Sequence, residues 1–286
     1  MTIAVSGDNA TVSVYSKDRS FQVGAFVAIF LLLICVIGGK NGVKSVIGLA
    51  FTGVSIVYLL FPMMYIGISP FWSAILICAL TTIVTMCLIG GFTKKTICAI
   101  VGTVIGVLMA GVSAWLFGLA ADIDGYNVSN IETLIYVEQV TSIKVGELLF
   151  AAILIAALGA VMDVAMSVSS AICEIHVNSP TLNARQLFTS GMNVGRDMMG
   201  TMSNTLILAF VGSSLSTLLL DYTYDLPFRQ LTNSYNIGIE IMQGISGSIG
   251  VILAVPATAA VTAVLIGRRK PKVAEMQEVS ERSGVS

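Results

Sequence analysis

The sequence predicts an all-α protein, a polytopic transmembrane helix bundle of about seven spans with its N-terminus outside and its C-terminus inside. Hydrophobic residues make up 56% of the 286 residues and charged residues only 11%, whereas soluble domains carry about 25% charged residues. Apolar runs of about 20 residues, the length that crosses a hydrocarbon core of about 30 Å as a helix, recur along the chain. Lysine and arginine gather in alternate loops, which sets the orientation.

The expected transmembrane domain covers 21–267, between an extracellular polar tail at 1–20 and a charged cytoplasmic tail at 268–286. In the first tail, the alternating run at 10–15 predicts at most one short strand, which would have no partner. The seven expected spans are 21–38, 44–65, 71–90, 97–119, 147–172, 198–220 and 245–267.

The basic residues give the orientation, because positively charged short loops stay on the cytoplasmic side of a membrane. With seven spans, eleven of the fifteen Lys and Arg residues fall on the side that holds the C-terminus. The other four are Lys17, Arg19, Lys144 and Arg229. One span more or fewer would scatter the basic residues over both faces, so the same distribution supports seven spans.

No metal site or cofactor is indicated, and nothing indicates nucleic acid binding. The five cysteines lie in or beside apolar segments, without the spacing of Cys or His that a metal site would show. We interpret them as small buried apolar side chains. In the acidic loop at 120–145, Asp122 and Asp124 match only the start of a calcium loop, so a solvated loop is expected.

Small residues recur every four positions on two spans, and such stripes let helix backbones approach closely in lipid. We expect both stripes to pack helices within one bundle, with a dimer face as the alternative. The stripes are Gly102, Gly106 and Ala110 on span four, and Ala152, Ala156 and Ala160 on span five.

The block at 159–205 concentrates polar and charged side chains in a chain that is otherwise mostly apolar. A charged side chain in hydrocarbon costs about 2.5 to 3.5 kcal/mol on insertion scales, so spans that keep several pair them or give them water. One face of span five carries Asp163, Ser167, Ser170 and Glu174. The residues just before span six and its first turns carry Arg196, Asp197, Thr201 and Asn204.

Spans five and six are antiparallel in this scheme, which brings Asp163 and Arg196 to a similar depth. We expect the two side chains to form an ion pair or hydrogen-bonded cluster at the inner ends of these spans. Ser167, Thr201 and Asn204 would complete this polar site. The alternative is a cluster that only locks the two helices together, with Arg196 reaching the membrane interface.

Between these spans, the segment 179–190 is expected to form a short amphipathic helix on the cytoplasmic membrane surface. Ser179 suits the N-cap of this helix and Pro180 its first position. Gly191 is expected to end it.

Span seven adds a third set of polar residues. Asn236, Glu240, Gln243 and Gly244 fall near one helix face, and Pro256 lies further along the span. Glycine and proline beside polar residues are the usual sign of a discontinuous helix that lines a cavity. Glu240 would then lie near the outer mouth of the cavity, with an ordinary exposed acid as the alternative.

Several stretches of the second half of the chain form a recognisable set. They are GAVMDVAMSVSSAICEI at 159–175, SGMNVGRDMMGTMSNTLILAFVG at 190–212, Asn236, Glu240, 246–250 and 256–259. Together they resemble the YibE/F family of bacterial multi-spanning membrane proteins. Ser203 stands where this resemblance leads us to expect threonine, a change that keeps the hydroxyl. The resemblance implies a multi-pass protein of the bacterial plasma membrane, often with a partner of the same family.

Three functions from different classes fit these residues. A permease or exporter coupled to protons or another ion fits best, with Asp163 binding the ion and Arg196 holding an anionic group or tuning Asp163. Thr201 and Asn204 would contact the cargo. The alternative is a non-catalytic membrane subunit in a complex with a second family member or in a homo-oligomer. An intramembrane hydrolase using Asp163 and Asp197 as an acid pair fits least, so we expect no enzyme.

Overall fold

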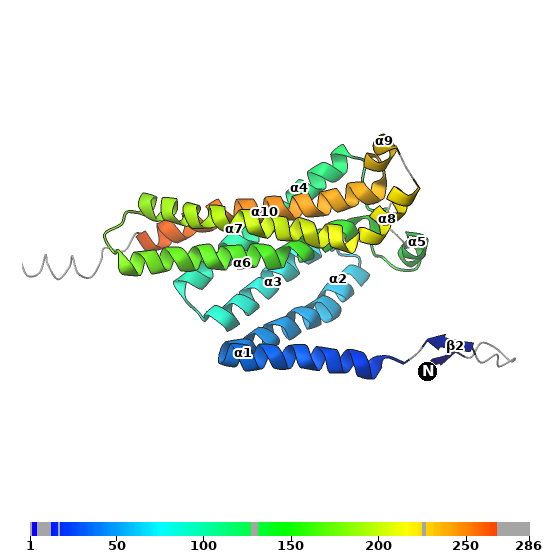
Figure 1. Ribbon diagram of the computed structural model, residues 1–286, viewed down its shortest axis with the longest axis horizontal. Coiled ribbons are helices and arrows are strands. Elements are labelled where there is room, and N and C mark those ends of the chain that lie inside the picture. Colours follow the sequence, from blue (N-terminus) through cyan, green and yellow to red (C-terminus); the bar gives the residue numbers. More distant parts are fainter. Residues whose placement is uncertain (1, 5–12, 17, 127–130, 225–226, 268–286) are drawn as a thin grey trace, which may run out of the picture. The chain divides into compact units, whose positions relative to one another are not determined.

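The computed structural model of the chain describes residues 2–4, 13–16, 18–126, 131–224 and 227–267. The backbone contacts divide the chain into two compact units, Met1–Ala50 and Phe51–Ser286. The first unit holds a small sheet and most of the first helix, and the second unit holds a bundle of helices (Figure 1).

The first unit contains two short strands ahead of a long helix. Strands β1 (Thr2–Ala4) and β2 (Ser13–Ser16) pair antiparallel. The expectation of a lone strand without a partner was therefore wrong. At three residues, β1 is too short for an alternating pattern to reveal it. Helix α1 (Ser20–Ser55) follows.

A glycine divides α1 where the first expected span ends. Gly39 has a φ of 52° and a ψ of −132°, outside helical values, so α1 is kinked there. Figure 1 shows that the ribbon of α1 is not straight. Glycine adopts a positive φ readily because it has no Cβ. The helical segment continues through the π-helical turn η1 (Ile56–Leu60) into α2 (Phe61–Tyr65). It therefore covers the residues of the first two expected spans.

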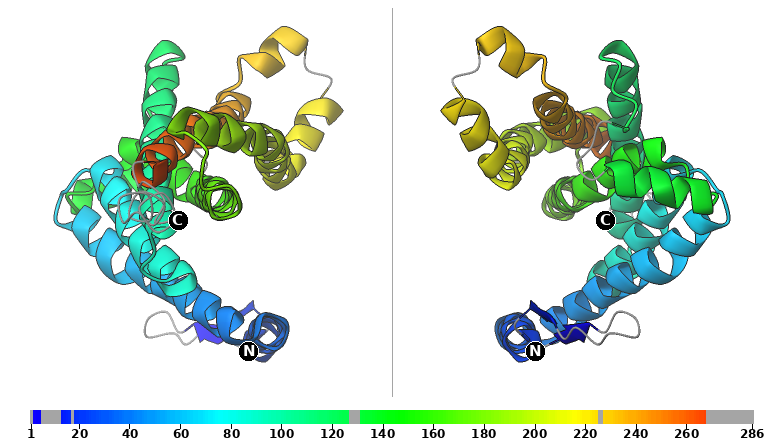
Figure 2. Two further views of the ribbon diagram at one scale, coloured as in Figure 1. Left: turned by 90° about the vertical axis from the view of Figure 1, so that its left-hand side faces the viewer. Right: turned by 90° about the vertical axis from the view of Figure 1, so that its right-hand side faces the viewer.

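In the second unit, the long helices pack into a bundle whose centre is α10 (Figures 1 and 2). Helix α10 contacts α4, α6 and α7 along their lengths, and α3 packs beside α4 and α6. The bounds are α3 (Pro70–Gly90), α4 (Lys94–Ala120), α6 (Leu148–Asn178), α7 (Ala184–Ser213) and α10 (Tyr235–Gly267).

Short helices join the long ones at the end of the bundle where α6 and α10 begin. In Figure 2, α8 and α9 arch away from the bundle. The loop that was expected at 120–145 contains a helix as well as a turn. The short elements are α5 (Ile131–Val140), the 3-10 turn η2 (Val145–Glu147), α8 (Leu215–Thr223) and α9 (Phe228–Thr232).

The stripe of small residues on α4 packs within the bundle, as expected. A Cβ on Gly106 would lie 2.8 Å from the Cβ of Ala254 and 2.9 Å from the carbonyl oxygen of Gly250. A Cβ on Gly250 would in turn lie 2.8 Å from the Cβ of Ala110. A larger side chain at either glycine would therefore push α4 and α10 apart.

The second stripe, on α6, behaves differently. Ala152 and Ala156 are exposed and Ala160 is half-buried. The expectation of packing inside the bundle was therefore wrong for α6, because this helix buries a different face against α4 and α10.

The short connector helix expected at 179–190 does not form, and α7 continues through Gly191. The N-cap of α7 is Asn183, whose backbone N–H donates to the side chain of Gln186 at 2.9 Å in a capping box. Ser179 instead ends α6. Gly191 serves packing rather than a helix end, because a Cβ there would lie 2.4 Å from a side-chain carbon of α6.

The expected sixth span is neither one helix nor strongly apolar. Helix α7 ends at Ser213 and α8 begins at Leu215, which divides the run at 198–220. Within the described residues, five helical segments are long and apolar enough to cross a membrane, and α7 is not among them. The first of the five, Ser20–Tyr65, contains the turn at Gly39. The count of seven spans therefore stays a prediction.

Helix α10 is continuous through its glycines and through Pro256, so the expected discontinuous helix is absent. Membrane helices tolerate proline when neighbouring groups satisfy the freed carbonyl. The glycines provide close packing instead of a break. A Cβ on Gly247, for example, would lie 2.6 Å from a methyl carbon of Leu206 on α7.

Candidate functional site

The ion pair expected between Asp163 and Arg196 does not form. Both side chains are exposed, and the guanidinium of Arg196 donates a hydrogen bond to the side-chain oxygen of Asn193 at 3.3 Å. Within the described part of the chain, the ion pair that does form joins Lys144 to Glu147 at 3.9 Å. The inner ends of α6 and α7 therefore hold no charged pair within one chain.

Packing explains this result, because α6 and α7 meet through apolar and small side chains such as Ile172 and Gly191. The polar residues lie on other faces, and Thr201 uses its hydroxyl on its own helix, donating to the carbonyl oxygen of Met198 at 2.9 Å. We call these residues the polar face. It consists of Asp163, Glu174, Arg196, Asp197, Thr201 and Asn204, which are exposed, and Ser167 and Ser170, which are half-buried.

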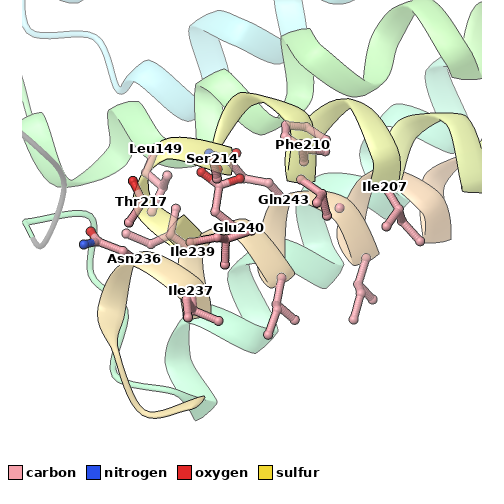
Figure 3. Close-up of a pocket in the computed structure, with 15 residues that line it drawn as sticks. Leu149, Ile207, Phe210, Ser214, Thr217, Asn236, Ile237, Ile239, Glu240 and Gln243 are labelled. Carbon is pink, nitrogen blue, oxygen red and sulfur yellow. The ribbon is translucent and has the colours of Figure 1, made fainter. Parts of the chain in front are cut away.

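A cavity of about 510 Å³ lies towards the other end of the bundle, lined by α7, α8, α10 and the first turn of α6 (Figure 3). Small-molecule sites in proteins commonly have volumes of about 300–1,000 Å³, so the cavity is large enough for such a ligand. None of the polar-face residues lines it. Its polar lining consists of Ser214, Thr217, Asn236, Glu240 and Gln243.

Helix α10 provides most of this polar lining. Asn236, Glu240 and Gln243 follow one another at helical spacing, which places them on one face of α10. The sequence predicted that these three residues and Gly244 share a face, and all four line the cavity. These residues line the cavity on an unbroken helix, whereas a discontinuous helix was expected.

Two polar atoms in the cavity wall are buried and have no hydrogen-bond partner among the described residues. They are Oε2 of Glu240 and Oγ of Ser214, whose side chain belongs to a residue only 8% exposed. Leaving a buried donor or acceptor unpaired costs about 1–3 kcal/mol, and more for a charged group. Figure 3 shows Ser214, Glu240 and Gln243 close together, with Asn236 further away. The wall thus presents a carboxylate and a hydroxyl that can bind a ligand.

Apolar side chains form the rest of the wall, and they decide which ligands suit it. A carboxylate among apolar groups attracts a cation, and the apolar groups favour a cation that brings apolar surface of its own. The ring of Phe210 can add a cation–π contact. The apolar lining consists of Leu149, Ile207, Phe210, Val211, Leu218, Ile237, Ile239, Ile241 and Ile245.

Sequence reasoning did not select Ser214 and Thr217. Both lie near the end of the sixth expected span, and their spacing does not indicate a binding site. The break between α7 and α8 falls at Ser214, which places both residues opposite α10. A serine near the predicted end of a polar-faced helix is the only signal that the sequence offers.

Comparison with known proteins gives one result for this chain. The family model described as YibE/F-like protein matches residues 26–268. This range contains the helix bundle and the cavity. A search of curated proteins and a search of solved structures gave no match.

Proposed function

The chain belongs to the family of YibE/F-like proteins, and from that premise we propose that it is a membrane permease or exporter whose binding site is the cavity around Glu240. The observation that carries the proposal is the unpartnered carboxylate oxygen of Glu240 in the cavity wall. An ionisable residue within a membrane bundle is costly, and it is commonly kept where ions or substrates pass. Asp163 does not line the cavity, so Glu240 takes the coupling role in this proposal.

The lining favours an organic cation with an apolar body as the substrate. Glu240 neutralises the positive charge, Ser214 and Gln243 orient polar groups of the ligand, and the apolar wall covers the rest. For coupling, Glu240 exchanges the cation for a proton, which keeps the cavity neutral in both states and avoids an unpaired charge. Transport in one direction then drives proton movement in the other.

In our proposal the protein lies in the bacterial plasma membrane and crosses it seven times. The two parts of α1 on either side of Gly39 supply the first two crossings, and α7 supplies the sixth. The orientation, with the C-terminus inside, is supported by the basic residues near the α3–α4 and α6–α7 loops, which are Lys94, Lys95 and Arg185. The cavity then lies nearer the outer surface.

A second candidate function is that of a non-catalytic subunit in a larger membrane complex. The exposed polar face favours it, because charged side chains at membrane depth need protein cover. The two functions are compatible, since the cavity and the polar face share no residue. An enzyme finds no comparable support, because Asp163 and Asp197 are both exposed and no hydrogen bond between the two is present in the described residues.

The proposal is tested with the full chain in proteoliposomes, using radiolabelled tetraphenylphosphonium as the probe and an imposed proton gradient as the driving force. We expect gradient-driven movement of the probe, with a loss of at least about tenfold in Glu240→Gln, because the neutral amide cannot hold a cation. Glu132→Gln on α5, an exposed position outside the cavity, is the matched control and should move the probe like the wild type. Equal probe movement by Glu240→Gln and the wild type would refute the proposal.

A further inference from the structure

The polar face of α6 and α7 is exposed although it lies beside helices that are apolar enough to span a membrane. Helix α7 packs along α6 and α10, both of which belong to candidate spans. If α7 supplies the sixth crossing, as proposed above, Asp163, Arg196, Asp197 and Asn204 lie at membrane depth, and no other described part of the bundle covers them. Exposing these groups to lipid is energetically costly, because hydrocarbon provides neither an opposite charge nor hydrogen-bond partners.

The other long helices of the described residues offer no charged partner for the polar face. The segments 20–39, 45–66, 70–90 and 96–120 contain no Asp, Glu, Lys or Arg. In α10 the charged residue is Glu240, which lines the cavity. A cover made of membrane-spanning helices must therefore bring its charges from a second protein chain.

The polar face carries both signs of charge, and the two signs sit on neighbouring helices. Asp163 is on α6, and Arg196 is on α7. Counted from the loop at 179–183 that joins the helices, Asp163 and Arg196 differ in depth by about 5 Å, given a rise of about 1.5 Å per residue. A two-fold axis along the membrane normal brings residues of equal depth together and places α6 of one copy against α7 of the other. The pair of Asp163 with Arg196 then forms twice, once on each side of the axis.

Small residues make room for such an approach. A Cβ on Gly159 or on Gly200 would meet nothing within 4 Å, so neither glycine is explained by packing inside the bundle. Ala152 and Ala156 extend the exposed small surface along α6. Small side chains on the exposed side of a membrane helix allow a second helix to come close.

We propose that the polar face is the interface with a second copy of this chain, in which Asp163 of each copy pairs with Arg196 of the other. The dimer is isologous, so each residue contact occurs twice across the two-fold axis. Asn204, Thr201 and the serines of α6 supply hydrogen bonds around the two ion pairs. The pairing expected within one chain is thereby made between two chains.

The test uses the full chain carrying one of two affinity tags, co-expressed in pairs, extracted in detergent and captured through one tag. We expect the wild type to recover the second tag and to give the mass of two copies in native mass spectrometry. Asp163→Arg places two arginines opposite each other, and Arg196→Asp places two aspartates opposite each other. Each variant should therefore lose self-association by at least about tenfold, because like charges at an interface repel.

The decisive sample combines the two variants. A chain with Asp163→Arg and a chain with Arg196→Asp present opposite charges at both contacts, so the mixed pair should associate nearly as well as the wild type. This recovery also shows that each variant folds. Glu132→Arg, on the exposed face of α5, is the control and should leave self-association unchanged.

Four outcomes would overturn the proposal. The wild type could be recovered as a single copy, the mixed pair could fail to associate while the wild type does, or each variant could self-associate like the wild type. Capture of a different membrane protein in place of the second copy would also overturn it. None of these outcomes bears on probe movement through the cavity, so the two proposals are tested separately.

Discussion

The cavity and the polar face hold similar chemical groups in opposite settings. In the cavity, Glu240 and Ser214 lie among residues of four helices of the same chain, and among the described residues their buried oxygens have no hydrogen-bond partner. On the polar face, Asp163 and Arg196 lie open on α6 and α7. A polar group in the wall of a largely apolar cavity can orient a small ligand. An exposed polar group at membrane depth needs a partner large enough to cover it.

The largest expected effect comes from disrupting the packing of α7 against α10, because α7 contributes residues to both the cavity and the polar face. A Cβ on Gly195 would lie 2.2 Å from Val255 on α10, so Gly195→Leu forces α7 away from α10. Overpacking of this kind costs about 1–3 kcal/mol, and sometimes more. We expect a lower midpoint of thermal unfolding in detergent, together with loss of probe binding and of self-association.

Gly200→Leu is the matched variant, five residues further along α7. A Cβ on Gly200 would meet nothing within 4 Å, so leucine there should leave the unfolding midpoint and the binding of tetraphenylphosphonium unchanged. Self-association should be lost, because the larger side chain holds the second copy away. If Gly200→Leu lowers the unfolding midpoint as much as Gly195→Leu does, Gly200 packs inside the bundle and does not face a second copy.

A smaller effect is expected for Ser214→Ala, which removes one of the two unpartnered oxygens of the cavity. Because a hydrogen bond contributes about 0.5–1.5 kcal/mol net, probe affinity should fall by a few-fold. The unfolding midpoint should stay the same or rise, since a buried unpaired hydroxyl is removed. Equilibrium binding and thermal unfolding measure the two quantities, and unchanged affinity would exclude Ser214 from the site.

The smallest effect on stability is expected from the hydrogen bond between Tyr126 and Glu138, which lies in neither the cavity nor the polar face. The hydroxyl of Tyr126 donates to Oε1 of Glu138 at 2.9 Å, and this hydrogen bond raises the pKa of Tyr126. A raised pKa means that the contact stabilises the fold fully below the unfolded pKa of about 10 and is lost as the pH rises through the folded value.

We therefore expect the unfolding midpoint to fall slightly more steeply above pH 10 in the wild type than in Tyr126→Phe. Probe binding and self-association should be equal in the two proteins at neutral pH. A difference in either at neutral pH would show that the loop at 120–145 contributes to one of the regions.

Much of the fold could be predicted from the sequence, because the period and length of apolar runs act locally. The turn near Gly39, the helices α3, α4, α6 and α10, and the shared face of Asn236 and Glu240 follow from such local signals. The start of α7 was predicted wrongly, because Ser179 was expected to cap a helix and Asn183 caps α7 instead. Serine and asparagine are both favoured N-cap residues, so the residue type alone does not decide where a helix begins.

The sequence by itself determined that this chain is a helical membrane protein of the YibE/F-like family and that polar residues gather on three of its helices. Only the tertiary structure decided which polar residues meet. The angular position of α6 against α7 opens Asp163 and Arg196 to the outside, while the end of α7 at Ser213 completes a cavity around Glu240. The physical reason is that a helix pattern fixes which residues share a face, whereas the direction of that face depends on contacts between distant segments.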